Sequence, residues 1–349
     1  MGTLRRLASV AAAPVLAVVL LSPLAAQTTE DASQADRLDS LERQMELLAA
    51  SLDEVAKKVD DLLWFERVGD VAAIDKVYLP TVPNPKEDET YGIANSRHPF
   101  RMWAYVLAPR GEAKGRRPLL VLPHGGVHGS FETYYTHVVR ELIAEGYVIV
   151  APEYRGSTGY GRGYYEAIDY GGLEVDDVVA ARDWAVATLP GVDPERVGIL
   201  GWSHGGLISL MAVFAHPEKF RVAYAGVPVS DLLARMGYAT DGYRELFSAE
   251  HHIGKTANEA VDEYRRRSPV FHADKLRVPL LIHTTTNDRD VNVVEVQSLI
   301  TALKAAGKDF QYKVYPDAPG GHSFNRMDSL LARESRREVY EFLARYLKK

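Results

Sequence analysis

Short apolar runs alternate with amphipathic stretches along most of this chain, and this alternation limits the folds open to it. The apolar runs have the length of β-strands: PLLVLP, YVIVAP, RVGILG, VAYAGVPV, PLLIHT and FQYKVYP. Helical patterns lie between and after them, at residues 131–145, 174–189, 206–216, 292–306 and 328–347. Such alternation predicts a mostly parallel, doubly wound sheet covered by helices on both faces. Two more strand-like runs precede the series, so the predicted α/β domain spans residues 68–349.

A serine flanked by glycines stands at one of the strand-to-helix junctions. GWSHG, residues 201–205, fits the pattern G-x-S-x-G and lies between RVGIL and GLISLMAVF. In a nucleophile elbow the serine occupies strained backbone on a sharp turn, and the residues two positions away must be small. The five residues alone arise by chance in about one chain in ten of this length. The position at the junction therefore identifies Ser203 as the candidate nucleophile.

A serine hydroxyl needs a base that removes its proton and a carboxylate that orients the base. In this architecture the acid and then the histidine follow the serine in the chain. Asp288 and Asp290 come after PLLIHT, and His322 lies in the glycine-rich loop after FQYKVYP. Both segments follow strand ends, where the chemistry of such sheets gathers. The other histidines downstream of the serine are interpreted as surface or packing residues: His216, His251, His252, His272 and His283.

Acyl transfer also needs N–H donors for the oxyanion of the tetrahedral intermediate. The loop LPHGGVHG follows a predicted strand, and the backbone N–H of Gly126 is expected to supply one donor. The backbone N–H of His204, the residue after the nucleophile, is expected to supply the other. His124 and His128 could be two ligands of a metal ion, but no third ligand lies near them in the sequence. The sequence therefore predicts neither a metal ion nor another cofactor.

From about residue 68 onward the chain resembles the prolyl oligopeptidase family of serine hydrolases, which implies an α/β-hydrolase fold. The resemblance is carried by HGGVHGS, PEYRGSTGYGRGYYEA, GGLEVDDVVAARDWA, VDPERVGILGWSHGG, RRRSPVFHADKLRVPLLI and GGHSF. It implies Ser203 as nucleophile, His322 as base and an acid in a D-x-x-V segment, which Asp288 begins here. It also implies a mainly structural role for Arg155, which would brace its loop.

The chain departs from the family pattern at three places. HTTTND has Thr284 where glycine is usual, and its acid comes one residue later, which leaves Asp290 as an alternative to Asp288. Glu153 stands where Asn or Asp is commoner. No N-terminal β-propeller, which filters peptides in many relatives, is predicted before residue 68. The resemblance therefore supports the chemistry more strongly than it supports peptides as substrates.

The N-terminal residues have the pattern of an export signal. MGTLRR is basic, and LASVAAAPVLAVVLLSPLAA is apolar and ends in small residues. We expect residues 1–26 to be a signal peptide, which places the mature protein in the periplasm or outside the cell without a stable membrane span. An uncleaved membrane anchor is the alternative. The polar residues 27–37 are predicted to be a linker.

A heptad pattern follows in residues 38–63. Apolar residues recur at alternating steps of three and four: Leu38, Leu41, Met45, Leu48, Leu52, Val55, Val59 and Leu62. This pattern predicts a helix that joins protomers in a coiled coil, and hence a possible homo-oligomer. The alternative is an amphipathic helix that packs on its own catalytic domain, which apolar residues at the e positions favour. The sequence leaves both open.

Composition excludes several kinds of site and makes one kind of partner unexpected. The chain has no cysteine, which excludes disulfides, thiolate–zinc sites and a cysteine nucleophile. Its net charge is −6 and no basic face is evident, so nucleic acid is not an expected partner. We expect a secreted serine hydrolase that acts on a peptide or small-molecule substrate through an acyl-enzyme, with peptide bonds favoured. A carboxylesterase of small acyl or aryl esters is the alternative, and a non-catalytic interaction protein is a weaker one.

Overall fold

The computed structural model describes residues 22–83, 99–111 and 115–348. The chain divides into two compact units, Met1–Leu52 and Asp53–Lys349. Most of the predicted signal peptide lies outside the described residues. None of the described helices is both long enough and apolar enough to cross a membrane.

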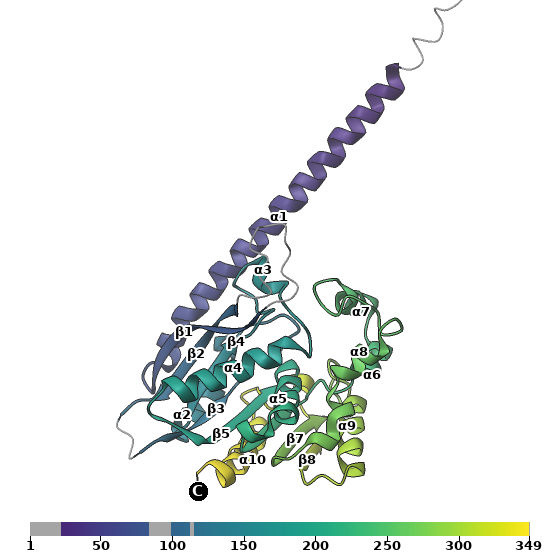
Figure 1. Ribbon diagram of the computed structural model, residues 1–349. Helices are drawn as coiled ribbons and strands as arrows, with labels where there is room; N and C mark the ends of the chain where they lie inside the picture. The colour runs from purple at the N-terminus through teal and green to yellow at the C-terminus, as the bar shows by residue number, and fades with distance from the viewer. Residues whose placement is uncertain (1–21, 84–98, 112–114, 349) are drawn as a thin grey trace, which may run out of the picture. The chain divides into compact units, whose positions relative to one another are not determined.

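The second unit is built around one sheet. Among the described residues its eight strands are β1 (Ala72–Pro83), β2 (Pro99–Pro109), β3 (Arg117–Val121), β4 (Val148–Glu153), β5 (Val192–Trp202), β6 (Val222–Gly226), β7 (Leu280–Thr285) and β8 (Gln311–Tyr315). Their order across the sheet is β1-β2-β4-β3-β5-β6-β7-β8 (Figure 1). β2 pairs antiparallel with both β1 and β4, and the strands from β4 to β8 are parallel.

Helices cover both faces of this sheet. On one face lie α4 (Leu173–Thr188), α5 (His204–Ala215) and α9 (Val293–Ala305). On the other lie α2 (Thr136–Ala144), α10 (Leu330–Leu347) and the end of α1 (Ser22–Val68). The prediction of a mostly parallel, doubly wound sheet with an α/β-hydrolase fold is therefore confirmed.

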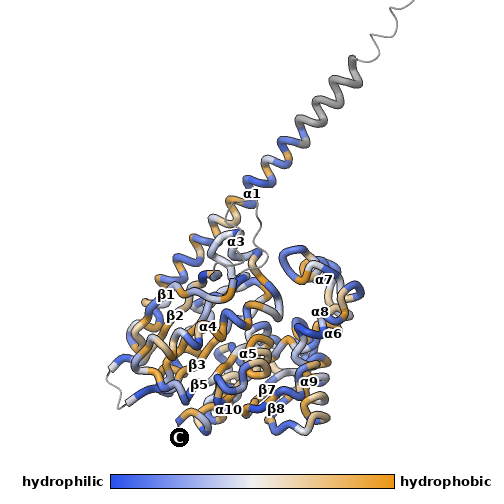
Figure 2. Tube along the Cα trace, in the orientation of Figure 1, coloured by the Kyte–Doolittle hydropathy of each residue, from blue (hydrophilic) through white to orange (hydrophobic). Residues whose placement is uncertain are grey.

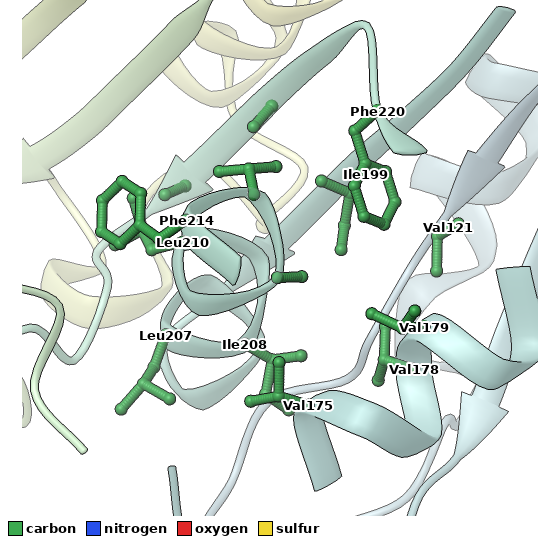
Figure 3. Packing of buried hydrophobic residues seen from close by; sticks show 14 of the residues in the cluster. Val121, Val175, Val178, Val179, Ile199, Leu207, Ile208, Leu210, Phe214 and Phe220 are labelled. Carbon is green, nitrogen blue, oxygen red and sulfur yellow. The ribbon is translucent and has the colours of Figure 1, made fainter. Parts of the chain in front are cut away.

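Alternate residues of each strand pack into the two layers of the core, one layer on each face of the sheet. In β3, Leu119 and Val121 pack into one layer, whereas Leu120 packs into the other. Figure 3 shows the first layer, in which the valines of α4 face side chains from α5 and β5. Each fully buried side chain of this size stabilises the fold by about 1.5–3 kcal/mol. Because both faces are covered, the central strands need apolar residues at almost every position.

The segment between β6 and β7 contains short helices for which the sequence analysis named no elements. They are α6 (Leu232–Tyr238), α7 (Asp241–Ser248), α8 (Val261–Arg266) and the 3-10 segment η4 (Pro269–Lys275). Side chains cap two of them: Asp231 accepts the N–H groups of Leu233 and Ala234, and Thr240 accepts that of Tyr243. Helices of one or two turns show little periodicity, so they depend on such caps and on packing.

The long N-terminal helix α1 differs from the sequence-based prediction. Residues 27–37, which were expected to form a linker, are part of α1, which begins at Ser22. Those eleven residues contain neither proline nor glycine, and several of them are good helix formers. The prediction of irregular structure, which rested on polarity alone, was therefore wrong. Figure 2 shows hydrophobic and hydrophilic residues alternating along the coloured part of the helix.

The last four turns of α1 belong to the catalytic unit. Trp64 and Val68 are fully buried in the layer beneath β2 and β3, and the Trp64 ring stacks on Phe131 with 4.8 Å between the centroids. Lys57, two turns before Trp64, is buried on the same side of the helix. This face is not the heptad seam, since Val55, Val59 and Leu62 are all more than half exposed.

Candidate active site

Ser203 lies on the sharp turn between β5 and α5. Its backbone has φ 59° and ψ −120°, which is strained for a residue with a side chain. The neighbouring glycines are required by close approach. A Cβ atom on Gly201 would lie 2.2 Å from the carbonyl oxygen of Gly205, and one on Gly205 would lie 2.3 Å from that of Pro123. The elbow predicted from G-x-S-x-G is thus present, and the sterics account for its glycines.

His322 and Asp288 are brought together by two loops that follow neighbouring strands. His322 lies in the 3-10 segment η5 (Gly321–Ser323) after β8, and Asp288 lies in the turn after β7. His322 Nδ1 donates a hydrogen bond to Asp288 Oδ2 at 2.8 Å. The second oxygen of the carboxylate, Oδ1, accepts the backbone N–H groups of Asp290 and Val291, each at 2.9 Å. Both oxygens of the Asp288 carboxylate are therefore hydrogen-bonded, one to the imidazole and one to the backbone.

Asp290 approaches the same imidazole from its other side. Its Oδ2 lies 3.6 Å from His322 Nε2, and its Oδ1 accepts a hydrogen bond from Arg235 Nη2 at 2.9 Å. The Asp290 side chain is 55% exposed, whereas that of Asp288 is fully buried. The extra residue in this loop therefore places one carboxylate on each imidazole nitrogen, and only Asp288 lies at hydrogen-bond distance.

The loop that follows β3 lies directly against the Ser203 turn. A Cβ atom on Gly125 would lie 3.1 Å from the carbonyl oxygen of Trp202 and 3.6 Å from Ser203 Cβ. The N–H of Gly125 donates to Tyr135 Oη at 3.3 Å, and Gly126 has the left-handed φ of +94°. His204 is the first residue of α5, so its N–H has no partner within the helix. Of the two predicted oxyanion donors, His204 directly follows Ser203 in the chain, and Gly126 is the next residue along this loop after Gly125.

Among the described residues, the hydrogen bonds of this site do not include one between Ser203 Oγ and His322 Nε2. Such bonds are often long before substrate binds, so their absence in the free protein does not argue against the pair.

Two buried charged side chains, Glu153 and Lys57, connect the Gly126 loop to α1. Glu153 is fully buried, accepts the N–H of Phe131 and lies 3.0 Å from the ammonium nitrogen of Lys57. Lys57 Nζ also donates to the carbonyl oxygen of Phe131 at 2.7 Å. Burial raises the pKa of Glu153, and the nearby Lys57 charge opposes that rise. The sequence analysis noted Glu153 as unusual but missed Lys57, which only the docking of α1 brings to it.

His124, the first residue of the HGG loop, is a structural residue here. It is fully buried, its Nε2 lies 2.8 Å from Ser157 Oγ, and its ring stacks on Tyr154. Burial lowers the pKa of His124 to about 3, so its ring is neutral at physiological pH. It therefore supports the loop without adding charge to it.

Arg155 makes the structural contacts that the family resemblance implies. Its guanidinium is fully buried and donates to both oxygens of Asp177, with 2.8 Å for the Nε–Oδ2 and Nη2–Oδ1 pairs. It also donates to the carbonyl oxygen of Val82 at 2.8 Å. These bonds join the loop after β4 to α4 and to the end of β1.

Replacing Lys57 with methionine is expected to destabilise the fold by about 3–5 kcal/mol, because it leaves the buried Glu153 carboxylate without its cation. Urea unfolding measures this loss. Adding Glu153→Gln to the variant should recover part of it, since glutamine carries no charge. Lys58→Met, in which the exposed neighbouring lysine is replaced, is the control and should change stability little. Equal losses for Lys57→Met and Lys58→Met would contradict the role of the buried pair.

Comparisons with known proteins agree with the fold and the motifs. The model of the prolyl oligopeptidase family matches residues 133–349. The chain is 31% identical over 217 residues to the uncharacterized peptidase YuxL of Bacillus subtilis (strain 168), covering 62% of this chain and 32% of that protein. It is 26% identical over 255 residues to the acylamino-acid-releasing enzyme of Arabidopsis thaliana, covering 71% of this chain and 33% of that protein.

Among solved structures, the acylaminoacyl peptidase of Pyrococcus horikoshii superposes with a TM-score of 0.67 at 21% identity. The match covers 80% of this chain and 42% of that one. This chain spans about a third of the length of the curated relatives it matches. With a family model that covers more than half of its residues, the chain belongs to the prolyl oligopeptidase family.

Proposed function

We propose that this protein is a serine peptidase that cleaves amide bonds through an acyl-enzyme on Ser203. The relatives are named as peptidases, acylamino-acid-releasing enzymes and dipeptidyl peptidases, which favours peptide substrates over simple esters. The observation that carries the proposal is the hydrogen bond from His322 to Asp288. It leaves Nε2 of the imidazole free of a proton in the neutral form, as a general base requires.

The proposed reaction begins with attack of Ser203 Oγ on the scissile carbonyl carbon while His322 Nε2 takes the hydroxyl proton. The carbonyl oxygen becomes an oxyanion, and the N–H groups of Gly126 and His204 donate to it. Collapse of this intermediate breaks the C–N bond, and His322 returns the proton to the leaving amine. Water, deprotonated by the same imidazole, then attacks the ester carbonyl; the bond to Ser203 Oγ breaks, His322 returns the proton to Oγ, and the acid is released.

Asp288 acts on the base rather than on the substrate. It holds the Nδ1–H tautomer and stabilises the imidazolium that forms during each proton transfer. Its second oxygen is held by two backbone N–H groups, so the carboxylate cannot turn away from the ring. In this proposal, binding of substrate closes the contact between Ser203 and His322.

A fluorophosphonate probe and a substrate panel test the proposal together. Mass spectrometry should locate the phosphonate on Ser203. Aminoacyl, acyl-aminoacyl and dipeptidyl anilides should be hydrolysed alongside p-nitrophenyl esters. Hydrolysis of the esters alone would favour the carboxylesterase, and a protein that neither reacts with the probe nor hydrolyses any substrate would favour the interaction protein.

We also propose that the protein is exported, on the basis of the basic and apolar residues 1–26 alone. Cell fractionation and N-terminal sequencing test this proposal. A mature N-terminus near Gln27 in the periplasmic fraction is the expected result, and an intact N-terminus in the cytoplasm would contradict it.

A further inference from the structure

Three histidines from distant parts of the chain meet beside the Gly126 loop. His128 lies in that loop, and His251 and His252 lie in the turn that follows α7. The Nε2 atoms of His128 and His252, 124 residues apart in sequence, are 2.9 Å apart. One ring nitrogen from each of the three histidines lies within 4.8 Å of the other two. The sequence analysis found no third ligand near His128, because the other histidines join it only in the folded chain.

The His128 ring is held in the tautomer that a metal ligand needs. Its Nδ1 lies 2.8 Å from the carbonyl oxygen of Gly156, which can only accept, so Nδ1 carries the proton and Nε2 keeps its lone pair. The ring also stacks on Tyr165, with 3.4 Å between the centroids and 7° between the planes. A bond from the outer nitrogen to a backbone carbonyl is the usual way in which proteins orient a histidine that binds metal.

All three histidines are at least partly buried. His252 is fully buried, and its ring meets that of His128 edge-on. The cluster thus offers three imidazole nitrogens within a small volume, which is the kind of ligand set that a divalent transition-metal ion binds.

We propose that His128, His251 and His252 bind one divalent transition-metal ion, with Zn²⁺ as the expected occupant. Imidazole suits zinc, copper and nickel better than calcium or magnesium, which prefer oxygen. In a tetrahedral zinc site the ligand nitrogens stand about 3.4 Å apart. The widest pair here must therefore close by at most about 1.4 Å, which rotation of a side chain can provide. Three protein ligands leave the fourth position open to water.

Metal binding would join two parts of the catalytic unit. His128 is two residues from Gly126, and a Cβ atom on Gly126 would lie 3.0 Å from the His128 carbonyl oxygen. His251 and His252 belong to the segment between β6 and β7 that carries α6, α7 and α8. The ion would thus fasten the loop after β3 to that segment.

Calorimetric titration of the untagged protein with Zn²⁺, after dialysis against a chelator, tests the site without any substrate. We expect one ion per chain and no comparable heat with Mg²⁺ or Ca²⁺. His251→Ala and His252→Ala should each weaken binding by at least about 100-fold, since even the loss of an outer-sphere partner costs 10–100-fold. Zn²⁺ should also raise the Tm of the wild-type protein by a few degrees.

His272→Ala is the matched control and should bind Zn²⁺ as the wild type does, because His272 is outside the three-histidine cluster and bonds only to the Arg266 carbonyl among the hydrogen bonds of the described residues. Circular dichroism checks that the variants are folded. Wild-type protein without stoichiometric binding would overturn the proposal, and so would binding that survives in both His251→Ala and His252→Ala.

A second observation concerns the heptad seam of α1. All eight seam residues are more than half exposed: Leu38, Leu41, Met45, Leu48, Leu52, Val55, Val59 and Leu62. The residues by which α1 docks on the catalytic unit, Lys57 and Trp64, are both at the f position of the same heptads, opposite the seam. The sequence left open that α1 docks on its own domain through the seam. Between residues 53 and 68 the helix does dock on that domain, but by the opposite face.

The geometry points to a second copy of this chain as the partner of the seam, in a parallel two-stranded coiled coil. The repeat of 3.5 residues holds for nearly four heptads with apolar residues at every a and d position. In a parallel pair, Arg37 at a g position would face Glu42 at the following e position of the other helix, which is a favourable charge pair.

Analytical ultracentrifugation of Leu48→Lys and Leu47→Lys tests this second proposal. The two leucines are adjacent and equally exposed, at 70% and 69%, but only Leu48 is in the seam. Leu48→Lys should weaken dimerisation at least about 100-fold, since each chain would bury a lysine. Leu47→Lys should leave the dimer unchanged. A monomeric wild type at tens of micromolar, or equal effects of the two variants, would overturn the proposal.

Discussion

Replacement of Ser203 by alanine is expected to lower kcat by about 10⁶-fold, the loss typical of removing the nucleophile from a Ser-His-Asp triad. The side chain that attacks the substrate is then gone, and only binding and the oxyanion donors remain to stabilise the transition state. Alanine has the same Cβ as serine and meets the same strain at φ 59°, so the fold should keep its stability. Steady-state kinetics on the best anilide, together with the Tm, measure both effects.

Ser248→Ala is the control for this substitution, because its hydroxyl bonds only to the Glu245 carbonyl among the hydrogen bonds of the described residues. It should keep wild-type activity. The Ser203→Ala variant should also lose labelling by the fluorophosphonate probe. A Ser203→Ala protein that keeps a rate near that of the wild type would exclude the proposed acyl-enzyme.

Asp288→Asn is expected to lower kcat by about 10⁴-fold, because an amide at this position favours the wrong tautomer of His322. Asp290→Asn should cost no more than about tenfold. The Asp290 carboxylate is more than half exposed and lies 3.6 Å from Nε2, so its effect on the imidazolium is screened by solvent. Comparing kcat for the two variants decides which acid orients the base.

The two substitutions control for each other, since each removes one charge from the same loop. A larger loss for Asp290→Asn than for Asp288→Asn would move the assignment to Asp290.

Local patterns were sufficient for much of the fold. The strands and long helices after residue 117 follow from apolar runs and from periodicity, which act over a few residues. The elbow at Ser203 also follows from local sterics, because only small residues fit two positions before and after it. The order serine, acid, histidine along the chain then pointed to His322, because His322 lies in the loop that begins where a predicted strand ends.

The linker at 27–37 shows where local patterns failed. Polarity suggested irregular structure, but polar residues without proline or glycine propagate a helix that has already formed. The short helices α6, α7 and α8 were not predicted, for a different reason. One or two turns carry too few residues for a period to be visible, and their stability comes from caps and tertiary packing.

The sequence by itself determined the class of sheet, the turn at Ser203 and the candidate acids and base, because each rests on short-range geometry. Only the tertiary structure showed that Asp288, and not Asp290, lies at hydrogen-bond distance from the imidazole of His322, with two N–H groups holding its other oxygen. It also paired Lys57 with Glu153, and His128 with His251 and His252. Contacts between residues about a hundred positions apart depend on how helices and loops pack on the sheet, and no local pattern in one sequence encodes that packing.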